Sequence, residues 1–281
     1  MIDPKTYSPE TLADALEILK NSETTVIAGG TDVMVINASL LHGVFKENIL
    51  NLLNIKELNF IKDEGESISI GSCVTHADLA SSDVIKKHAP NLAYGASLIG
   101  GPQIRNRGTI GGNVCNASPA GDLLPSLYVL NAKLTLKSSE TERIVPISEF
   151  ATAPRKTILA GNELLTKITI DKVNSSDICG FERVAPRKAL AITKASVAIF
   201  AKMNGTMSDV KIAMGSVAPK VIRATLTEKF LEEKKLTEGL IASSVEKIRA
   251  DSKPIADIRS TAEYRSYITG ILLKRILEKY L

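Results

Sequence analysis

The residues best suited to chemistry lie in one short run at positions 108–122, Gly-Thr-Ile-Gly-Gly-Asn-Val-Cys-Asn-Ala-Ser-Pro-Ala-Gly-Asp. Gly111 and Gly112 permit backbone torsions and close approaches that a Cβ would block. Consecutive N–H groups at such a turn can form a concave nest for a phosphate or carbonyl oxygen. Thr109 and Asn113 add hydrogen-bonding side chains. A polar surface loop has the same composition, so the choice between a loop and a binding site depends on the rest of the chain.

A second double glycine lies upstream. Residues 24–27, Thr-Thr-Val-Ile, predict a short strand that runs into Ala28-Gly29-Gly30-Thr31-Asp32. The apolar residues 33–36 that follow predict a helix capped by Thr31 or Asp32. A strand, a double glycine and a helix start present N–H groups to an anion. The run has neither the GxGxxG pattern nor the lysine of a P-loop, which excludes both of those nucleotide sites.

Composition narrows the functional class. The 281 residues are 44% hydrophobic and 23% charged, which is ordinary for a soluble protein long enough for two domains. The net charge of +4 is not gathered in a basic block, and aromatic residues make up only 4%, so nucleic-acid binding is not expected. No apolar run is long enough to span a membrane, and the first residues do not resemble a signal peptide. We expect a cytoplasmic protein.

The elements of a metal or iron–sulfur centre are missing from the sequence. The cysteines are single and far apart, at Cys73, Cys115 and Cys179. The histidines lack ligand spacing and are expected to be surface or packing residues; they are His42, His76 and His88. Any redox centre in this chain is therefore organic, or it belongs to another chain.

The surrounding pattern predicts an α+β protein. We expect an amphipathic helix that opens at Ser8 and ends near Asn21. Further elements are expected as strands at 48–52 and 163–170, hairpins at 60–70 and 132–147, and short helices after Thr75 and at 90–98. A polar segment at 172–177 predicts a domain boundary. Beyond it we expect strands at 180–184, 195–203 and 210–217, with a turn at Asn204-Gly205, and then three helices.

Taken together, these motifs resemble the FAD-binding medium subunit of molybdenum hydroxylases, the family of xanthine, nicotinate and carbon monoxide dehydrogenases. The resemblance covers essentially the whole chain and rests on residues 27–32, 101–106, 109–113 and 118–122. It implies an FAD-binding domain of the vanillyl-alcohol-oxidase/p-cresol-methylhydroxylase type at 1–173, with α+β subdomains at about 1–56 and 57–173. It also implies a C-terminal α+β domain at 177–281, with a three-stranded antiparallel sheet and helices.

The resemblance also implies a cofactor site without a catalytic residue. The first glycine turn would wrap the FAD pyrophosphate through backbone N–H groups, and the second would take the other side of the cofactor. The residues implied are Val26, Ile27, Ala28, Gly29, Gly30, Thr31, Asp32, Val33, Gly100, Thr109, Ile110, Gly111, Gly112, Asn113, Asp122, Leu165 and Arg183. Weaker candidates are Lys156, Leu164, Phe181 and Lys188.

The implied function is electron transfer within a complex. Electrons would reach FAD from 2Fe–2S clusters on a small partner subunit, which receives them from a molybdenum cofactor on a large one, and would leave to an acceptor such as NAD. The lack of a cysteine cluster argues against the hydroxybenzoyl-CoA reductase branch, and residues 101–106 favour xanthine or nicotinate dehydrogenase relatives. Two alternatives remain: a stand-alone FAD oxidoreductase of the same flavin fold, and a flavin-free assembly module.

Overall fold

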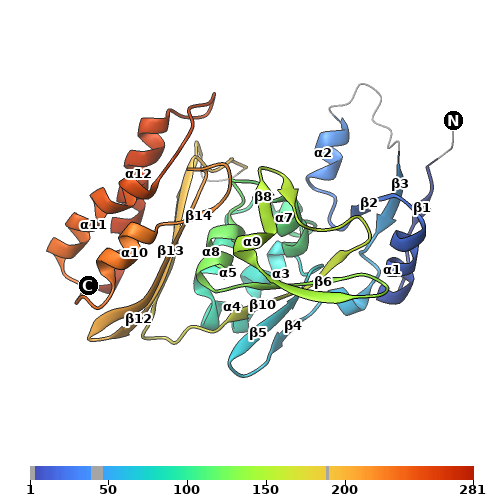
Figure 1. Cartoon of the computed structure of the whole chain (residues 1–281), viewed down its shortest axis with the longest axis horizontal. Coiled ribbons are helices and arrows are strands. Elements are labelled where there is room, and N and C mark those ends of the chain that lie inside the picture. The colour runs from blue at the N-terminus through green and yellow to red at the C-terminus, as the bar shows by residue number, and fades with distance from the viewer. Residues whose placement is uncertain (1–3, 39–46, 188–189) are drawn as a thin grey trace.

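The computed structural model describes residues 4–38, 47–187 and 190–281, which form three units side by side along the long axis of the molecule (Figure 1). The N-terminal unit is a parallel sheet with strand order β1-β3-β2, covered by helix α1. Its elements are β1 (Thr6–Tyr7), α1 (Leu12–Asn21), β2 (Thr24–Ile27), α2 (Val33–Ala38) and β3 (Asn48–Asn51). Helix α1 starts later than the sequence suggested, because the side chain of Thr11, not Ser8, accepts the capping hydrogen bond from Asp14 N–H.

The central unit is a five-stranded antiparallel sheet with strand order β4-β5-β10-β6-β7. Its strands are β4 (Ile61–Asp63), β5 (Ser67–Gly71), β6 (Lys133–Lys137), β7 (Glu142–Pro146) and β10 (Leu164–Asp171), with a small β8 (Ala151–Ala153)–β9 (Lys156–Thr157) pair beside them. Its helices are η1 (Lys56–Leu58), α3 (His76–Ser81), α4 (Asp83–His88), α5 (Pro90–Ser97), α6 (Pro102–Arg105), α7 (Ile110–Asn116), α8 (Leu123–Val129) and α9 (Ile147–Phe150). The expected hairpins and the Thr75 cap are confirmed.

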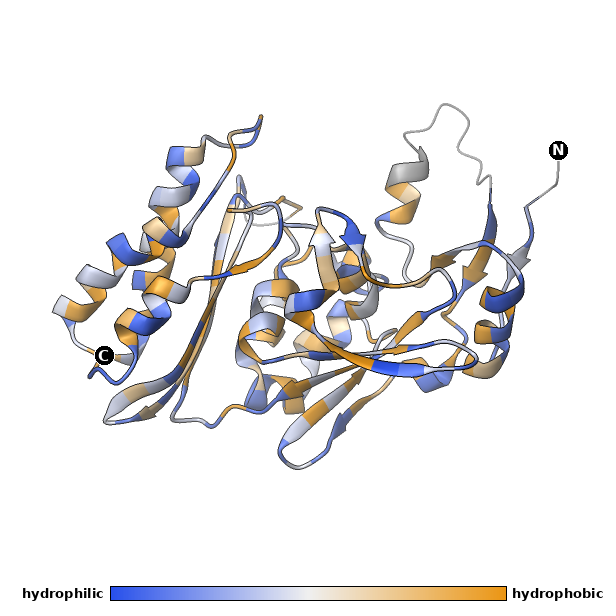
Figure 2. Cartoon of the chain, viewed as in Figure 1, coloured by the Kyte–Doolittle hydropathy of each residue, from blue (hydrophilic) through white to orange (hydrophobic). Residues whose placement is uncertain are grey.

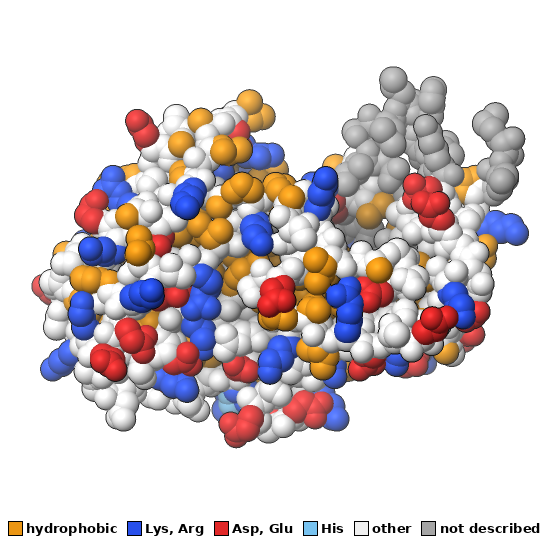
Figure 3. Space-filling model, in the orientation of Figure 1, with side chains coloured by type: hydrophobic (Ala, Val, Ile, Leu, Met, Phe, Trp, Pro, Cys, Tyr) orange, Lys and Arg blue, Asp and Glu red, His pale blue; other side chains and the backbone are white. Residues whose placement is uncertain are grey.

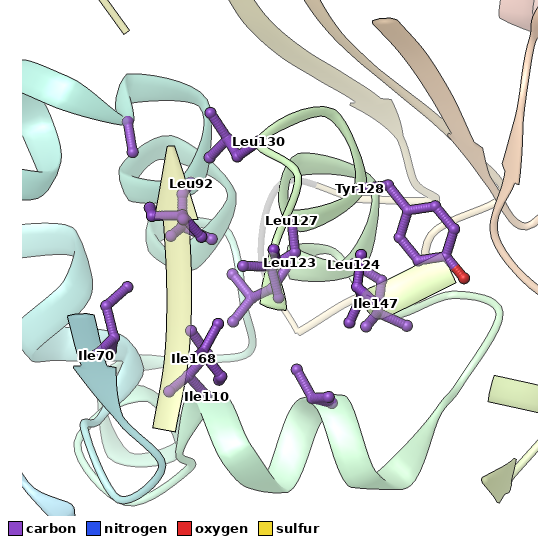
Figure 4. Close-up of a cluster of buried hydrophobic side chains, with 14 of the residues drawn as sticks. Ile70, Leu92, Ile110, Leu123, Leu124, Leu127, Tyr128, Leu130, Ile147 and Ile168 are labelled. Carbon is purple, nitrogen blue, oxygen red and sulfur yellow. The ribbon is translucent and has the colours of Figure 1, made fainter. Parts of the chain in front are cut away.

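The core of the central unit joins its sheet to its helices. Ile70 and Ile168 from the sheet point toward Leu92, Ile110 and Leu123 of the helices (Figure 4). These side chains are fully buried. Burial of each one stabilises the folded state by roughly 1.5–3 kcal/mol. Ile110 is the first residue of helix α7, and its side chain belongs to this core. The core therefore holds the start of α7 in place.

The C-terminal unit is a four-stranded antiparallel sheet, β11-β12-β13-β14, with three helices on its outer face (Figure 1). The strands are β11 (Ile178–Val184), β12 (Ala195–Asn204), β13 (Thr206–Gly215) and β14 (Ile222–Arg223), and the helices are α10 (Thr225–Leu231), α11 (Glu238–Asp251) and α12 (Ala262–Leu277), followed by η2 (Glu278–Tyr280). The sequence predicted the first three strands and the helices. It did not predict β14, whose two residues are too few to give a periodic signal.

Strand β12 is buried on both faces. Val197 and Ile199 pack with the outer helices, whereas Ala198 and Phe200 pack with the central unit. In Figure 2, hydrophobic positions predominate along the long strands, and the outer helices alternate between hydrophobic and hydrophilic positions. The C-terminal sheet is therefore a layer between the outer helices and the central unit, and its connecting loops lie against the central unit. No helix in the described part of the chain is long and apolar enough to cross a membrane.

Candidate functional site

A cavity of about 1010 Å³ lies where the three units meet. Both glycine turns line it, as do residues from the loops of the C-terminal unit at 191–193, 216–219 and 255–265. The face shown in Figure 3 carries basic and acidic side chains mixed together, without a patch of one sign. This face therefore offers no charged patch for a ligand, and the charged residues considered below are those that line the cavity.

The first glycine turn connects β2 to α2. Gly30 has φ +74°, a left-handed conformation that favours glycine, and its carbonyl accepts a hydrogen bond from Met34 N–H at 2.9 Å. The backbone N–H groups of residues 29–32 donate to no other residue that the structure describes. All four of these residues line the cavity. The turn thus offers four consecutive donors to an anion.

The second glycine turn is different, because its donors are already used. Thr109 caps α7, and its Oγ1 accepts from Gly112 N–H at 3.1 Å. Ile110 and Gly111 donate to carbonyls of the β5–α3 connection, and Asn113 donates to Thr109 O. The expectation of free N–H groups at Gly111 and Gly112 is therefore wrong. This turn contributes shape and side chains, including Asn113 Oδ1, which is buried without a partner among the described residues.

The two turns touch each other. A Cβ on Gly29 would lie 1.8 Å from the carbonyl oxygen of Arg107, just before the second turn. A Cβ on Gly111 would lie 2.6 Å from Ser72 O. By contrast, a Cβ on Gly30 would meet nothing nearer than 3.6 Å. The first glycine of each pair is needed for close packing against backbone. The second glycine of each pair lines the cavity, and so does Gly29, whereas Gly111 does not.

Asp122 closes the second turn with a buried ion pair. Its carboxylate pairs with Arg183 Nη1 and accepts from Thr193 Oγ1 at 2.6 Å. Arg183 also donates to the carbonyl of Leu98 at 2.6 Å. Burial raises the pKa of Asp122 to about 6, against the opposing charge and hydrogen bonds of Arg183 and Thr193. These bonds fasten the C-terminal sheet to the helices of the central unit.

The predicted residues divide between cavity and core. Those that line the cavity are Val26, Ala28, Gly29, Gly30, Thr31, Asp32, Val33, Gly100, Thr109, Gly112, Asn113 and Asp122. Those outside it are Ile27, Ile110, Gly111, Leu165 and Arg183. Leu165 is buried in the central core, and Arg183 lies behind Asp122. Of the weaker candidates, Leu164 and Phe181 are buried, Lys156 is an exposed residue of β9, and Lys188 lies outside the described residues.

Sequence reasoning missed His76. This histidine lines the cavity, is 4% exposed, and donates its backbone N–H to Gly108 O at 2.9 Å. Burial, aided by the charge of Arg105, lowers its pKa to about 4, so the ring is neutral at pH 7. Its Nδ1 is buried and has no partner in the described part of the chain. The only feature of the neighbouring sequence that could have pointed to His76 is its position directly after Thr75, the N-cap of α3.

Arg155 was missed as well. Its guanidinium donates to both Asp32 carboxylate oxygens, at 3.1 and 3.5 Å, across 123 positions of sequence. Its backbone is left-handed at φ 59°, and its N–H donates to Ala117 O at 3.3 Å. The pair joins the first glycine turn to the central unit at the cavity. A contact of this range leaves no periodic trace in the sequence.

Two family models match the chain. Residues 3–172 match the model of the FAD binding domain in molybdopterin dehydrogenase, and residues 182–280 match that of the CO dehydrogenase flavoprotein C-terminal domain. The chain is 32% identical to the glyceraldehyde dehydrogenase medium chain of Sulfolobus acidocaldarius, over 96% of this chain and 95% of that one. It is 30% identical to the xanthine dehydrogenase FAD-binding subunit of Escherichia coli O157:H7, over 96% and 93%. A chain of the reconstituted CO dehydrogenase from Oligotropha carboxidovorans superposes with a TM-score of 0.92 at 28% identity, covering 100% of this chain and 99% of that one.

Proposed function

The chain belongs to the family of FAD-binding medium subunits of molybdenum hydroxylases, and from this premise we propose that it relays electrons within a multi-subunit dehydrogenase. The observation that carries the proposal is the run of four N–H donors at residues 29–32, facing a cavity shared by all three units. A pyrophosphate dianion is well satisfied by such donors and the start of a helix.

The residues of the cavity fit FAD. Gly29–Asp32 would hold the pyrophosphate, and the second turn, with Gly112 and Asn113, would form the opposite wall. Asn113 Oδ1 is a buried acceptor without a partner in the described chain, suited to an N–H donor of a nucleotide or flavin ring. Bound FAD would supply the redox chemistry, taking electrons from 2Fe–2S clusters of a small subunit fed by a molybdenum cofactor on a large subunit, and giving them to an acceptor such as NAD.

Charge pairing in the cavity supports a relay over a stand-alone FAD oxidoreductase. Such an enzyme needs its own acid or base beside the flavin. Each carboxylate among the described lining residues is held in an ion pair; these are Asp32, Asp122 and Asp257. Intact cavity-facing glycines argue against the flavin-free assembly module. The cytoplasmic location and the domain limits 1–173 and 177–281 stay predictions.

The test is flavin binding by the purified chain. After addition of FAD and gel filtration, we expect a visible flavin spectrum at one FAD per chain. Gly30→Leu is expected to lose the flavin and remain folded, because the space around Gly30 opens to the cavity. Gly65→Leu is the matched control, since Gly65 also has a positive φ, +87°, but lies in an exposed hairpin turn. A colourless wild-type chain, or Gly30→Leu that binds FAD as Gly65→Leu does, would contradict the proposal.

A further inference from the structure

A buried imidazole lies where the two glycine turns touch. A Cβ on Gly108 would lie 2.9 Å from Cδ2 and 3.1 Å from Nε2 of His76. A Cβ on Gly29, in the first turn, would lie 2.9 Å from the Cα of the same Gly108. Gly108 therefore contacts both the Cδ2–Nε2 edge of the His76 ring and the first turn. Gly29, Gly108 and His76 all line the cavity.

The backbone around His76 holds this ring in one place. His76 is the first residue of α3, whose N-cap, Thr75, forms a complete capping box. The His76 N–H donates to Gly108 O at 2.9 Å, and the Gly108 N–H donates to Ile104 O at 2.7 Å. The residue is only 4% exposed, so its close-packed ring has little room to turn. The imidazole is therefore a fixed group of the cavity wall.

The hydrogen-bonding capacity of the ring is not used by the protein. Neither ring nitrogen of His76 has a hydrogen-bond partner in the part of the chain that the structure describes. Burial and the charge of Arg105 lower the pKa of His76 to about 4, so the ring at pH 7 carries one N–H donor and one lone pair.

The position of the two nitrogens decides which one carries the proton. A buried N–H without an acceptor is rarer in proteins than a buried acceptor without a donor. Nδ1 is fully buried, whereas Nε2 belongs to the ring edge beside Gly108. We therefore assign the lone pair to Nδ1 and the proton to Nε2. The Nε2–H group requires an acceptor, and the space that this residue borders is the cavity.

We propose that His76 binds the cofactor by donating a hydrogen bond from Nε2 to a phosphate oxygen of the FAD pyrophosphate. The inference rests on the proposed function, which places that pyrophosphate at residues 29–32. A charged phosphate oxygen is a strong acceptor. The imidazole adds a side-chain donor to the four backbone donors of the first turn, and as a neutral group it is not repelled by Arg105.

A binding role and a packing role for His76 predict different behaviour of the FAD-free chain. A packing residue stabilises the chain whether or not the cofactor is present. The unpaired ring nitrogens of His76 instead oppose folding, because they lose their hydrogen bonds to water and gain none from the protein. Removal of these nitrogens should therefore weaken FAD binding without lowering the stability of the FAD-free chain.

The experiment measures both quantities for the full chain at pH 7. In a fluorescence titration, we expect His76→Leu to raise the Kd for FAD about tenfold, the loss of one hydrogen bond to a charged acceptor. His76→Gln keeps a side-chain N–H and should raise the Kd less. Urea denaturation without FAD should find His76→Leu at least as stable as the wild type. His88→Leu is the matched control, because the half-buried His88 lies beside Val173 O and does not line the cavity.

The ³¹P NMR spectrum of bound FAD tests which part of the cofactor His76 contacts. We expect the pyrophosphate resonances to differ between the wild type and His76→Gln, because the donor to the phosphate has changed. The same resonances should be unchanged in His88→Leu.

The combination of the three measurements decides the inference. Weaker FAD binding by His76→Leu, with undiminished stability and shifted ³¹P resonances in His76→Gln, supports it. An unchanged Kd overturns it, and so does a His76→Leu variant that is less stable or does not fold, since either assigns His76 to packing. Weaker binding with unchanged ³¹P resonances overturns the contact with phosphate. Failure of the wild type to bind FAD would instead break the proposed function, and the inference with it.

Discussion

At the first glycine turn the N–H groups of residues 29–32 have no acceptor among the described residues, whereas at the second turn those of residues 110–113 all do. The two runs share a double glycine, a threonine and an acidic or amide side chain. Their roles differ because of what surrounds them. The second turn is inserted beside the β5–α3 connection, whose carbonyls take its donors, and the first borders the cavity directly.

A glycine pair in a sequence therefore does not reveal which of its backbone N–H groups a ligand can reach. The first turn presents backbone N–H groups to the cavity, and the second forms a wall whose first helical residue, Ile110, is anchored in the central core. Direct contact between Gly29 and the backbone of Arg107 and Gly108 makes them one assembly. The following changes test that division.

The largest effect is expected from the aspartates that follow each turn. Asp122→Ala leaves the buried Arg183 without its partner and should lower the free energy of unfolding by about 3–5 kcal/mol. Asp32→Ala breaks the half-exposed pair with Arg155 and should cost less than about 1 kcal/mol. Urea denaturation of both variants measures the difference. Equal losses would mean that the second turn is no more firmly anchored than the first.

The next effect separates the two glycines of the second turn. Gly111→Ala places a Cβ 2.6 Å from Ser72 O and should destabilise the chain by about 3 kcal/mol. Gly112→Ala meets only Thr109 Oγ1 at 3.1 Å and should change stability by less than about 1 kcal/mol. Gly239→Ala, with nothing within 4 Å, is the control for the Ala substitution itself. Urea denaturation of the three variants measures these changes, and equal losses for Gly111→Ala and Gly112→Ala would contradict the different roles of the two glycines.

A smaller effect concerns the pH dependence of the wall beneath the second turn. His76 is neutral in the folded state, with a pKa of about 4, whereas an unfolded histidine titrates near 6.5. Its contribution to stability is therefore complete above pH 6.5 and is lost as the pH falls toward 4. Between pH 7 and pH 5 the loss should be about 2 kcal/mol, and it should be absent in His76→Gln. Urea unfolding curves of both proteins at the two pH values measure this loss. An equal loss of stability in the wild type and in His76→Gln would show that His76 is not buried as described.

Much of the fold could be predicted from sequence because it follows local rules. The Asn204-Gly205 turn between β12 and β13 and the Thr75 cap depend on neighbours a few residues away. The features that were missed depend on distant partners. The donors of Gly111 and Ile110 are taken by carbonyls some 40 positions upstream, and Asp257 meets Arg265 only because a loop folds back on a helix. Helix α1 was placed too early because Ser8 and Thr11 offer the same capping group.

Amide hydrogen exchange of the full chain, with and without FAD, tests the central claim most directly. Without FAD, the amides of residues 29–32 should exchange fast and those of residues 110–113 slowly, because only the latter donate to protein acceptors. Addition of FAD should protect residues 29–32 strongly and change residues 110–113 little. Protection that appears at residues 110–113 while residues 29–32 stay fast would contradict the account.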